Sequence, residues 1–262
     1  MEKLHGIIDT HAHYDDNAFN EDREEVIKNV FASGVDAVIN AGCSIASSKR
    51  AVEFTEQYDG FYAWCGIHPS DCRYIKDKDR ALFELETLLK KPKVVGVGEI
   101  GYDFHYPTPT REVQAKWFEW QMQLADRLKK PVAIHDRDAH GATMEMIKKY
   151  PEVKGILHSF SGSPEMALEL VKLGWYISFS GVVTFKNAKK TKDAATAVPI
   201  DRILIETDCP YLSPEPNRGK RNDSSNLIHT VSFLADIKKI TPQEMCDITR
   251  KNAINFLGIG KK

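Results

Sequence analysis

The chain lacks a strong net charge, a long hydrophobic run and any pairing motif for cysteine. Its 36 basic residues nearly balance 37 acidic ones, so the formal net charge is −1. A near-neutral protein does not coat nucleic acid through its overall charge, so phosphate recognition would have to come from local groups of cations. No segment of the 262 residues is apolar for long enough to cross a bilayer, and the first residues contain no apolar core typical of a signal peptide.

The five cysteines are scattered, odd in number and nowhere in C-x-x-C spacing. This pattern is typical of a reduced intracellular protein rather than of a disulfide scaffold. We therefore expect a cytoplasmic protein with no membrane partner.

Short apolar runs alternate with amphipathic segments along the whole chain. Because most runs are too short for helices and rich in Val and Ile, they indicate buried parallel strands. The expected strands are residues 6–9, 35–40, 61–66, 94–99, 132–135, 155–158, 175–178 and 202–206. Eight strand-then-helix cycles predict an α/β fold, a single (β/α)8 TIM barrel over residues 1–262. An open doubly wound sheet is the closest alternative, but it would use fewer strands.

The intervening segments carry helix signals. Residues 20–34, 111–130 and 163–174 are amphipathic, with Asn20 or Glu21 at the start of the first. Gly34 and Gly174 stand at helix ends. The longest irregular piece, residues 209–225, follows the last expected strand, where a barrel has an active-site loop.

Histidines and carboxylates gather where the expected strands end, which in such a barrel is the face that carries catalytic residues. Glu99 and Asp208 follow two of the strands. Five of the nine histidines also stand at strand ends, namely His11, His13, His68, His135 and His158.

Imidazole nitrogen together with carboxylate oxygen suits zinc, manganese and related divalent ions. Side chains two apart in a strand point to the same side, so His11 and His13 can bind one ion. A carboxylate such as Glu99 can bridge two ions about 3.5–4 Å apart, the spacing of two-metal hydrolytic sites. Each of these residues has an ordinary structural role as an alternative, but their conjunction on one face predicts a metal site there.

Residues 96–101 match the G-x-G-x-x-G spacing of dinucleotide-binding turns. That fingerprint requires a helix immediately afterwards, whereas this chain continues as YDFHYPTPT. We therefore exclude dinucleotide binding, and expect the glycines to let the backbone pass close to bulky neighbours around Glu99.

Taken together, the motifs resemble those of the TatD family of metal-dependent hydrolases, within the amidohydrolase-like barrels. The matching stretches are DTHAHYD, GIHP, VGEIGYDF, IHDRDA, LHSFSG, IETDCPYLSP and NRGKRN. They extend from Asp9 to Asn222, so the resemblance covers most of the chain.

The resemblance implies two divalent metal ions at the C-terminal face. His11, His13 and Asp208 would bind one ion, Glu99 would bridge to the second, and His135 and His158 would complete the ligand set of that second ion. Zinc or manganese is preferred over magnesium, because magnesium favours oxygen ligands and water. Asp208 and Glu99 are the implied catalytic residues, with Asp208 as a proton shuttle for the metal-activated water.

The family activity that this resemblance implies is hydrolysis of DNA phosphodiester bonds, commonly as a 3′-exonuclease. The expected partner is therefore DNA, either single-stranded or at 3′ ends. The alternatives are a D-aminoacyl-tRNA deacylase and an amide or lactone hydrolase of the wider superfamily, because metal ligands alone do not separate these reactions. A metal-binding adaptor without turnover is the non-enzyme alternative.

Candidate substrate contacts follow from the same motifs. His68 is expected near the substrate, with Asp103 orienting it. Arg137, Arg218, Lys220 and Arg221 are candidate phosphate contacts, because the guanidinium fork donates two hydrogen bonds to a phosphate. For Arg218 and Lys220 a solvated basic loop is an equal alternative.

Three further positions leave two roles open. Glu206 is either a carboxylate that supports the site or a buried partner for a lysine or arginine. Tyr102, Phe104 and Tyr106 either stack on bases or only pack. The chain departs from the family pattern at Tyr102, at Asn217 and at residues 223–225, and these departures concern substrate preference.

Overall fold

The computed structural model describes residues 3–260. Its eight strands are hydrogen-bonded in the order β1-β2-β3-β4-β5-β6-β7-β8, and the pairs with a defined register are parallel. The strands are β1 (Ile7–Ala12), β2 (Val35–Ala41), β3 (Phe61–Cys65), β4 (Val94–Asp103), β5 (Val132–Arg137), β6 (Gly155–Leu157), β7 (Tyr176–Phe179) and β8 (Ile203–Ile205).

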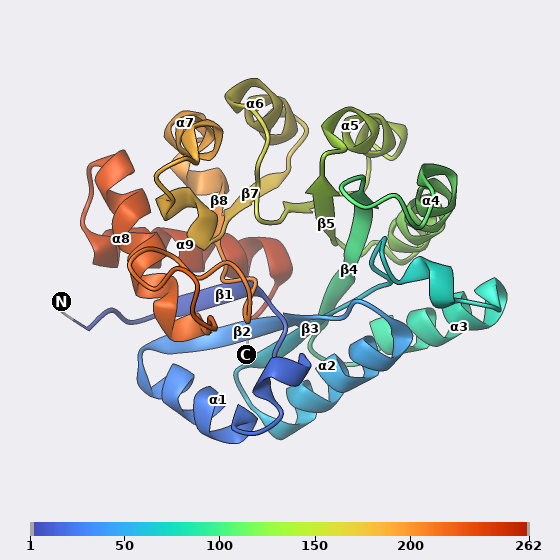
Figure 1. Cartoon of the computed structure of the whole chain (residues 1–262), viewed down its shortest axis with the longest axis horizontal. Coiled ribbons are helices and arrows are strands. Elements are labelled where there is room, and N and C mark those ends of the chain that lie inside the picture. Colours follow the sequence, from blue (N-terminus) through green and yellow to red (C-terminus); the bar gives the residue numbers. More distant parts are fainter. Residues whose placement is uncertain (1–2, 261–262) are drawn as a thin grey trace. The chain divides into compact units, whose positions relative to one another are not determined.

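At least one helix follows each strand along the chain, so strands and helices alternate throughout (Figure 1). A short 3-10 turn precedes the helix after β1, β3, β7 and β8. The helices are α1 (Arg23–Ala32), α2 (Ile45–Gln57), α3 (Lys78–Leu89), α4 (Arg111–Leu128), α5 (His140–Lys149), α6 (Pro164–Lys172), α7 (Lys189–Ala197), α8 (Leu227–Lys238) and α9 (Pro242–Leu257). The predicted eight strand-then-helix cycles are confirmed, and so is the α/β fold class.

The contacts of the chain divide it into two compact units. The first unit contains the described residues up to Asn40 and those from His158 onward, and the second unit is Ala41–Leu157. A single domain over residues 1–262 stays a prediction. In the first unit β1 pairs with β2 and β7 with β8, and the Asp208 amide donates to the His11 carbonyl. In the second unit β3, β4, β5 and β6 pair in sequence.

Strand β4 is longer than expected and continues past Glu99 to Asp103, with every residue buried. Its glycines are required by close neighbours, as expected. A Cβ at Gly96 would lie 2.2 Å from the Pro131 carbonyl oxygen, and one at Gly101 would lie 2.0 Å from that of His135. No helix begins at the end of the strand, because α4 starts only at Arg111, and the dinucleotide motif is therefore absent as a structure.

The first helix begins later than the sequence predicts. Asn17–Phe19 forms a 3-10 turn in which the Ala18 amide donates to the Asp16 side chain, and α1 starts at Arg23. The expected start at Asn20 or Glu21 is therefore wrong, because the local cap at Asp16 stabilises a separate turn. The expected helix ends at Gly34 and Gly174 are confirmed, and both glycines have positive φ, 110° and 87°.

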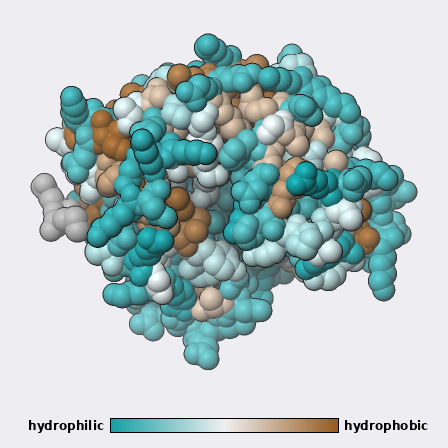
Figure 2. Space-filling view, turned by 45° about the horizontal axis from the view of Figure 1, so that its top comes forward, coloured by the Kyte–Doolittle hydropathy of each residue, from teal (hydrophilic) through white to brown (hydrophobic). Residues whose placement is uncertain are grey.

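The visible face in Figure 2 is largely hydrophilic, and its hydrophobic residues form small separate patches. Among residues 3–260, none of the helices combines the length and apolar character needed to cross a membrane. The five cysteines are free thiols, as expected, and all except Cys43 are buried.

Candidate metal centre

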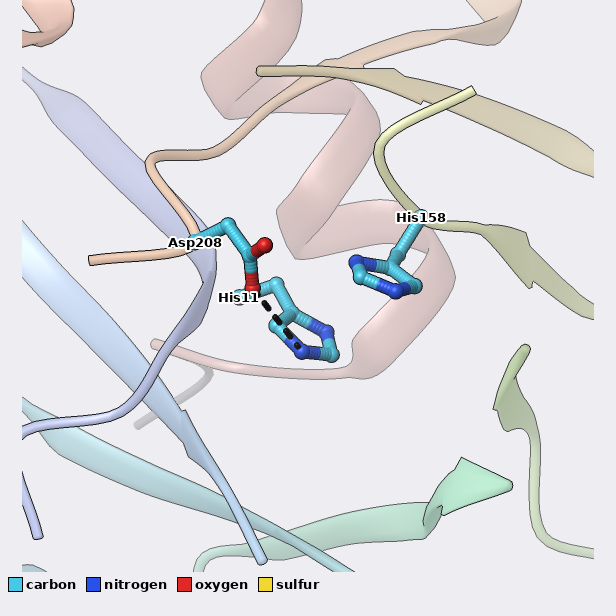
Figure 3. Close-up of side chains that lie close together, drawn as sticks. All are labelled: His11, His158 and Asp208. Carbon is cyan, nitrogen blue, oxygen red and sulfur yellow. Dashed lines mark ion pairs between the residues drawn. The ribbon is translucent and has the colours of Figure 1, made fainter. Parts of the chain in front are cut away.

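Three histidines and one aspartate lie close together in the first unit. We call them the first cluster: His11, His13, His158 and Asp208. The ligand atoms of His11, His158 and Asp208 lie within 4.8 Å of one another (Figure 3). The Asp208 Oδ1 atom lies 3.2 Å from His13 Nε2 and 3.9 Å from His11 Nε2. Both rings therefore approach the same carboxylate oxygen, and the binding of one ion by His11 and His13 stays a prediction.

The backbone of the first cluster is fixed by β1 and by the segment after β8. The Asp208 amide donates to the His11 carbonyl at 2.9 Å, and the His13 amide donates to the Cys209 carbonyl at 2.8 Å. Asp208 itself has φ 59°, a left-handed conformation that is uncommon outside glycine. Such conformations persist where the surroundings enforce them, often at functional sites.

Buried Glu206 supports His158. Its Oε1 atom lies 3.2 Å from His158 Nδ1 and also accepts a hydrogen bond from the Ser159 amide. A carboxylate on Nδ1 favours the tautomer that leaves Nε2 available to a metal. Of the two partners left open for Glu206, the structure shows a histidine of the first cluster, and the role of Glu206 in supporting a metal site stays a prediction.

Buried Asp9 holds the chain rather than a ring. It accepts hydrogen bonds from the amides of His11 and Thr207 and from the hydroxyls of Thr207 and Ser224. Burial raises the pKa of the Asp9 carboxyl to about 7, and these hydrogen bonds partly offset that rise. Asp9 therefore joins β1 to the segments after β8 that carry Asp208 and Ser224.

The electrostatics of the first cluster favour an ionised Asp208. Burial opposes ionisation, but the hydrogen bond with His13 and the nearby imidazoles hold the pKa of the Asp208 carboxyl below its usual value. The same carboxylate is then available as an anionic ligand.

The second unit contains a second cluster, formed by His68, Glu99 and His135, whose ligand atoms also lie within 4.8 Å of one another. His135 Nδ1 lies 2.7 Å from Glu99 Oε1, and His68 Nε2 lies 3.6 Å from the same oxygen. The chain places Glu99 here through the hydrogen bond from its amide to the Gly42 carbonyl. The sequence predicts His68 as a substrate contact rather than as a ligand, although its position after β3 is the signal for a ligand.

Asp103 supports the second cluster in the way that Glu206 supports the first. Its Oδ2 atom lies 3.3 Å from His135 Nε2, so the structure pairs it with His135, whereas the sequence argument paired it with His68. Burial raises the pKa of the Asp103 carboxyl, but the hydrogen bond with His135 and its charge bring it below the usual value. The Gln114 side chain on α4 holds the Asp103 backbone with two hydrogen bonds. Gln114 Oε1 accepts from the Asp103 amide, and Gln114 Nε2 donates to the Asp103 carbonyl.

The chemistry of both clusters fits a divalent ion. Imidazole nitrogen and carboxylate oxygen bind zinc at about 2.0–2.2 Å, so two donors on one ion are at most about 4 Å apart. The distances of 3.2 and 3.9 Å in the first cluster and 3.6 Å in the second meet this limit. In each cluster a second carboxylate occupies the far nitrogen of one histidine, as is usual for ligands of zinc.

All four predicted phosphate contacts lie at the surface, and the three arginines among them lie beside a carboxylate or an aromatic ring, whereas Lys220 is simply exposed. Arg221 donates to both carboxylate oxygens of Asp22 and lies over the Phe19 ring. Arg137 at the end of β5 lies 5.5 Å from the Tyr106 ring centroid. Arg218 lies 4.2 Å from the Phe185 ring centroid and 3.8 Å from Glu215. Their roles as substrate contacts stay predictions.

The three aromatic residues of the β4 end differ in exposure. Tyr102 is buried against Phe118, and burial raises the pKa of its hydroxyl to about 12, so its role is packing. Base stacking by Tyr102 is therefore wrong, because β4 continues through it. Tyr106 is exposed, and Phe104 is half-buried with Arg111 over its ring.

Two residues near the clusters carried no clear signal in the sequence. Cys43 Sγ lies 3.7 Å from Glu99 Oε2, and the Cys43 carbonyl accepts a hydrogen bond from the His68 amide. Ser224 donates to Asp9 and contacts the Tyr14 hydroxyl. Ser224 lies in the segment where the chain departs from the family pattern.

The comparisons with known proteins agree with this geometry. A family model described as TatD related DNase matches residues 8–258. The chain belongs to the TatD-related DNase family. This match covers nearly all of the described residues and includes both clusters.

Individual relatives extend over the same length. The chain is 40% identical over 249 residues to an uncharacterized metal-dependent hydrolase, YabD, of Bacillus subtilis (strain 168), covering 94% of this chain and 97% of YabD. It is 33% identical over 251 residues to the uncharacterized metal-dependent hydrolase YcfH of Escherichia coli (strain K12), covering 94% and 93%. The crystal structure of YjjV, a TatD homolog from Escherichia coli K12, superimposes with a TM-score of 0.90 at 29% identity, covering 97% and 98%.

These matches settle the class of the protein. It is a metal-dependent hydrolase of the TatD family, with the α/β TIM-barrel fold of its relatives. The histidine and carboxylate clusters are the residues in this chain that suit the metal dependence of that family.

Proposed function

We propose that the protein is a deoxyribonuclease of the 3′-exonuclease type, which cleaves phosphodiester bonds of DNA. The observation that carries this proposal is the pair of histidine and carboxylate clusters, each supported by a buried carboxylate, in a member of a family described as TatD related DNase. DNA that is single-stranded or has an accessible 3′ end is the proposed partner, and the cytoplasm is the proposed location.

Each cluster in this proposal binds one divalent ion, with zinc or manganese preferred to magnesium. Imidazole donors dominate both clusters, and magnesium favours an all-oxygen shell. The structure groups His158 with His11 and Asp208, so His158 is proposed as a ligand of the first ion. The bridging role of Glu99 and the placement of His158 beside His135 stay predictions from the family resemblance.

The bound ions would supply Lewis acidity at the phosphoryl group and make water a better nucleophile at neutral pH. Asp208 would accept a proton at its carboxylate, which is ionised before the reaction. Glu206 and Asp103 would hold His158 and His135 in one tautomer, so that the ligand nitrogens do not reorient during the reaction. Exposed arginines such as Arg137 would orient the phosphate through their planar forks.

Two other ester or amide reactions use the same kind of site. A D-aminoacyl-tRNA ester or a lactone would meet the same ligands, so the site alone does not separate these substrates from DNA. The family description as DNase favours the phosphodiester. A metal-binding adaptor would retain the metals and show no turnover with any of these substrates.

Parallel assays of one preparation test the proposal. The protein is loaded separately with zinc, manganese and magnesium, its metal content is measured, and each form is offered single-stranded DNA, a D-aminoacyl-tRNA and a lactone. We expect nucleotide release from 3′ ends of DNA with manganese or zinc. Turnover of only the tRNA ester or the lactone would overturn the DNase assignment, and metal binding without any turnover would favour the adaptor.

A further inference from the structure

A group of lysines at the start of α7 lies without counter-ions. Lys186, Lys189 and Lys190 are exposed, and in the described chain none of them forms an ion pair. Several other surface lysines are paired with carboxylates, namely Lys49, Lys78, Lys90, Lys129 and Lys149. The one acid on the first turns of α7, Asp193, is exposed and does not pair with them within residues 3–260. Three exposed lysines thus stand within residues 186–190 of a chain whose net charge is −1.

A cavity accompanies these charges. Lys189 and Lys190 line a cavity of about 360 Å³ together with Phe185, Asn187 and Thr191. The Arg218 guanidinium lies 4.2 Å from the Phe185 ring centroid, and its partner Glu215 is 3.8 Å away. We call this surface the α7 groove. It combines lysines that can bind phosphates, an amide for hydrogen bonding and an aromatic ring with a stacked arginine. Proteins use these groups to bind single-stranded nucleic acid.

The α7 groove is joined to the first cluster by short contacts within the first unit. The 3-10 turn η3 (Gly181–Thr184) leads into Phe185, and residue Ser180 before it contacts Ser159, the neighbour of His158, with 2.8 Å between hydroxyls. At its other end, Thr184 Oγ1 accepts a hydrogen bond from the Glu215 amide at 2.9 Å.

The loop after Asp208 also packs closely on this turn. A Cβ at Gly181 would lie 2.2 Å from the Leu212 carbonyl oxygen, so this loop and η3 are in backbone contact. The segments that carry His158 and Asp208 therefore both rest on the turn that builds the groove. A strand bound in the groove is held at a fixed place relative to these two ligands.

We propose that the α7 groove binds the phosphodiester backbone of single-stranded DNA and positions the strand for the first cluster. This inference rests on the proposed function, which it extends by naming where the strand binds. Several lysines in a row fit consecutive phosphates better than one small anion, which a single arginine fork would satisfy. Asn187 and the Phe185–Arg218 pair would contact sugar and base.

Charge reversal at the groove tests this proposal. The variant K189E/K190E is compared with K172E/K251E, which reverses two exposed lysines of the same unit outside the groove. The manganese-loaded proteins are assayed on long single-stranded oligothymidylate and on the dinucleotide. We expect K189E/K190E to lower the ratio of kcat/KM between the long and the short substrate by at least about tenfold, mainly through KM, because only the long strand reaches the lysines.

Salt dependence gives a second readout. With a phosphorothioate oligothymidylate that resists cleavage, the slope of log Kd against log salt should fall by about 1 to 1.5 in K189E/K190E, since each lost phosphate contact contributes about 0.7 for single strands. F185L, which keeps an apolar side chain but removes the ring, should raise Kd about fivefold or more through loss of stacking. The control K172E/K251E should match the wild type in both assays.

The outcomes separate this inference from the proposed function. If the wild type cleaves DNA and K189E/K190E keeps both the substrate ratio and the salt slope, the groove is overturned and the proposed function stands. If the wild type binds the oligonucleotide with a slope that K189E/K190E reduces, yet cleaves no DNA, the proposed function fails and the groove stands. Binding to anionic phosphatidylglycerol vesicles instead of to the oligonucleotide would overturn the groove as a DNA site.

Discussion

The two histidine and carboxylate clusters use the same chemistry but differ in their exposure to solvent. In the first cluster the histidine side chains of His11, His13 and His158 are 0%, 10% and 4% exposed, whereas in the second cluster those of His68 and His135 are 14% and 18% exposed. The carboxylates show the opposite order, with Asp208 at 16% and Glu99 at 4%. Each has a buried carboxylate on the far nitrogen of one histidine, Glu206 in the first cluster and Asp103 in the second. The difference teaches that similar donor sets, whose histidines differ in exposure, are expected to bind metal with different strength and exchange rates.

The largest effect is expected from Asp208→Asn in the first cluster. The substitution keeps the shape but removes the anionic ligand and the proposed proton acceptor. We expect hydrolysis to fall by at least about a thousandfold, because metal and charge stabilisation contribute several kcal/mol and each 1.36 kcal/mol is tenfold. Activity on a small phosphodiester and metal content by elemental analysis measure this loss. Asp201→Asn, an exposed acid of the same unit, is the matched control; full activity in D208N would remove Asp208 from the site.

The corresponding change in the second cluster is His135→Ala. We expect this variant to lose one metal equivalent and to lower hydrolysis by at least about a hundredfold, because Glu99 and His68 remain as ligands but the set is incomplete. The remaining equivalent should stay bound at the first cluster. His105→Ala removes an exposed histidine of the same unit and serves as the control. Retention of both metal equivalents and of full activity by H135A would contradict the assignment.

Removing the supporting carboxylates compares the two depths directly. Glu206→Gln and Asp103→Asn leave the metal ligands in place, and each should weaken metal binding at its own cluster by about 10–100-fold, because the histidine tautomer is no longer fixed. Glu206→Gln should have the larger effect, since its carboxylate is fully buried. Competition with a chelator measures both affinities, with exposed Glu152→Gln as the control. Equal metal affinities in E206Q and wild type would show that Glu206 does not support the site.

The smallest effect concerns the surface ion pair between Arg221 and Asp22. The hydrogen bond from Arg221 lowers the pKa of the Asp22 carboxyl below its usual 3.8. A lowered folded pKa contributes stability above the unfolded pKa, and this contribution is lost as the pH falls through the folded pKa. We therefore expect Arg221→Gln to lower the Tm by a small amount at pH 7, and the difference to shrink below pH 3.8.

That ion pair also bears on the predicted substrate role of Arg221. An Asp22→Asn variant removes the pair but keeps the arginine, so it separates stability from phosphate binding. If R221Q raises KM for DNA while D22N does not, the arginine contacts the substrate. If both variants change only the Tm, Arg221 is a structural residue of the surface.

The strands were predictable because burial on both faces produces continuous apolar runs. All eight expected runs are strands, yet their ends differ, as at β4, which continues to Asp103. This extension buries Tyr102 and thereby decides its role, because a residue within a covered strand cannot reach a base. Start positions of helices were less predictable, since the Asp16 side chain caps a separate turn before α1.

The candidate ligands were predictable because their residue types stand directly after the apolar runs. Their partners were not. Asp103 is paired with His135 rather than with His68, and Asp9 bonds to backbone amides and hydroxyls. Hydrogen-bond partners depend on side-chain rotamers and on loops from distant parts of the chain, for which a single sequence carries no pattern.

The sequence by itself determined the order of strands and helices and the donor types at the strand ends, because both follow from local periodicity and from residue chemistry. Only the tertiary structure decided which carboxylate contacts which histidine and where the lysines of the α7 groove lie relative to the first cluster. Glu206 and His158 are 48 residues apart along the chain but 3.2 Å apart in space. The lysines of the α7 groove gain their significance only because η3 packs between the segments that follow His158 and Asp208. Local patterns set the chemistry of this protein, and packing between distant segments sets its geometry.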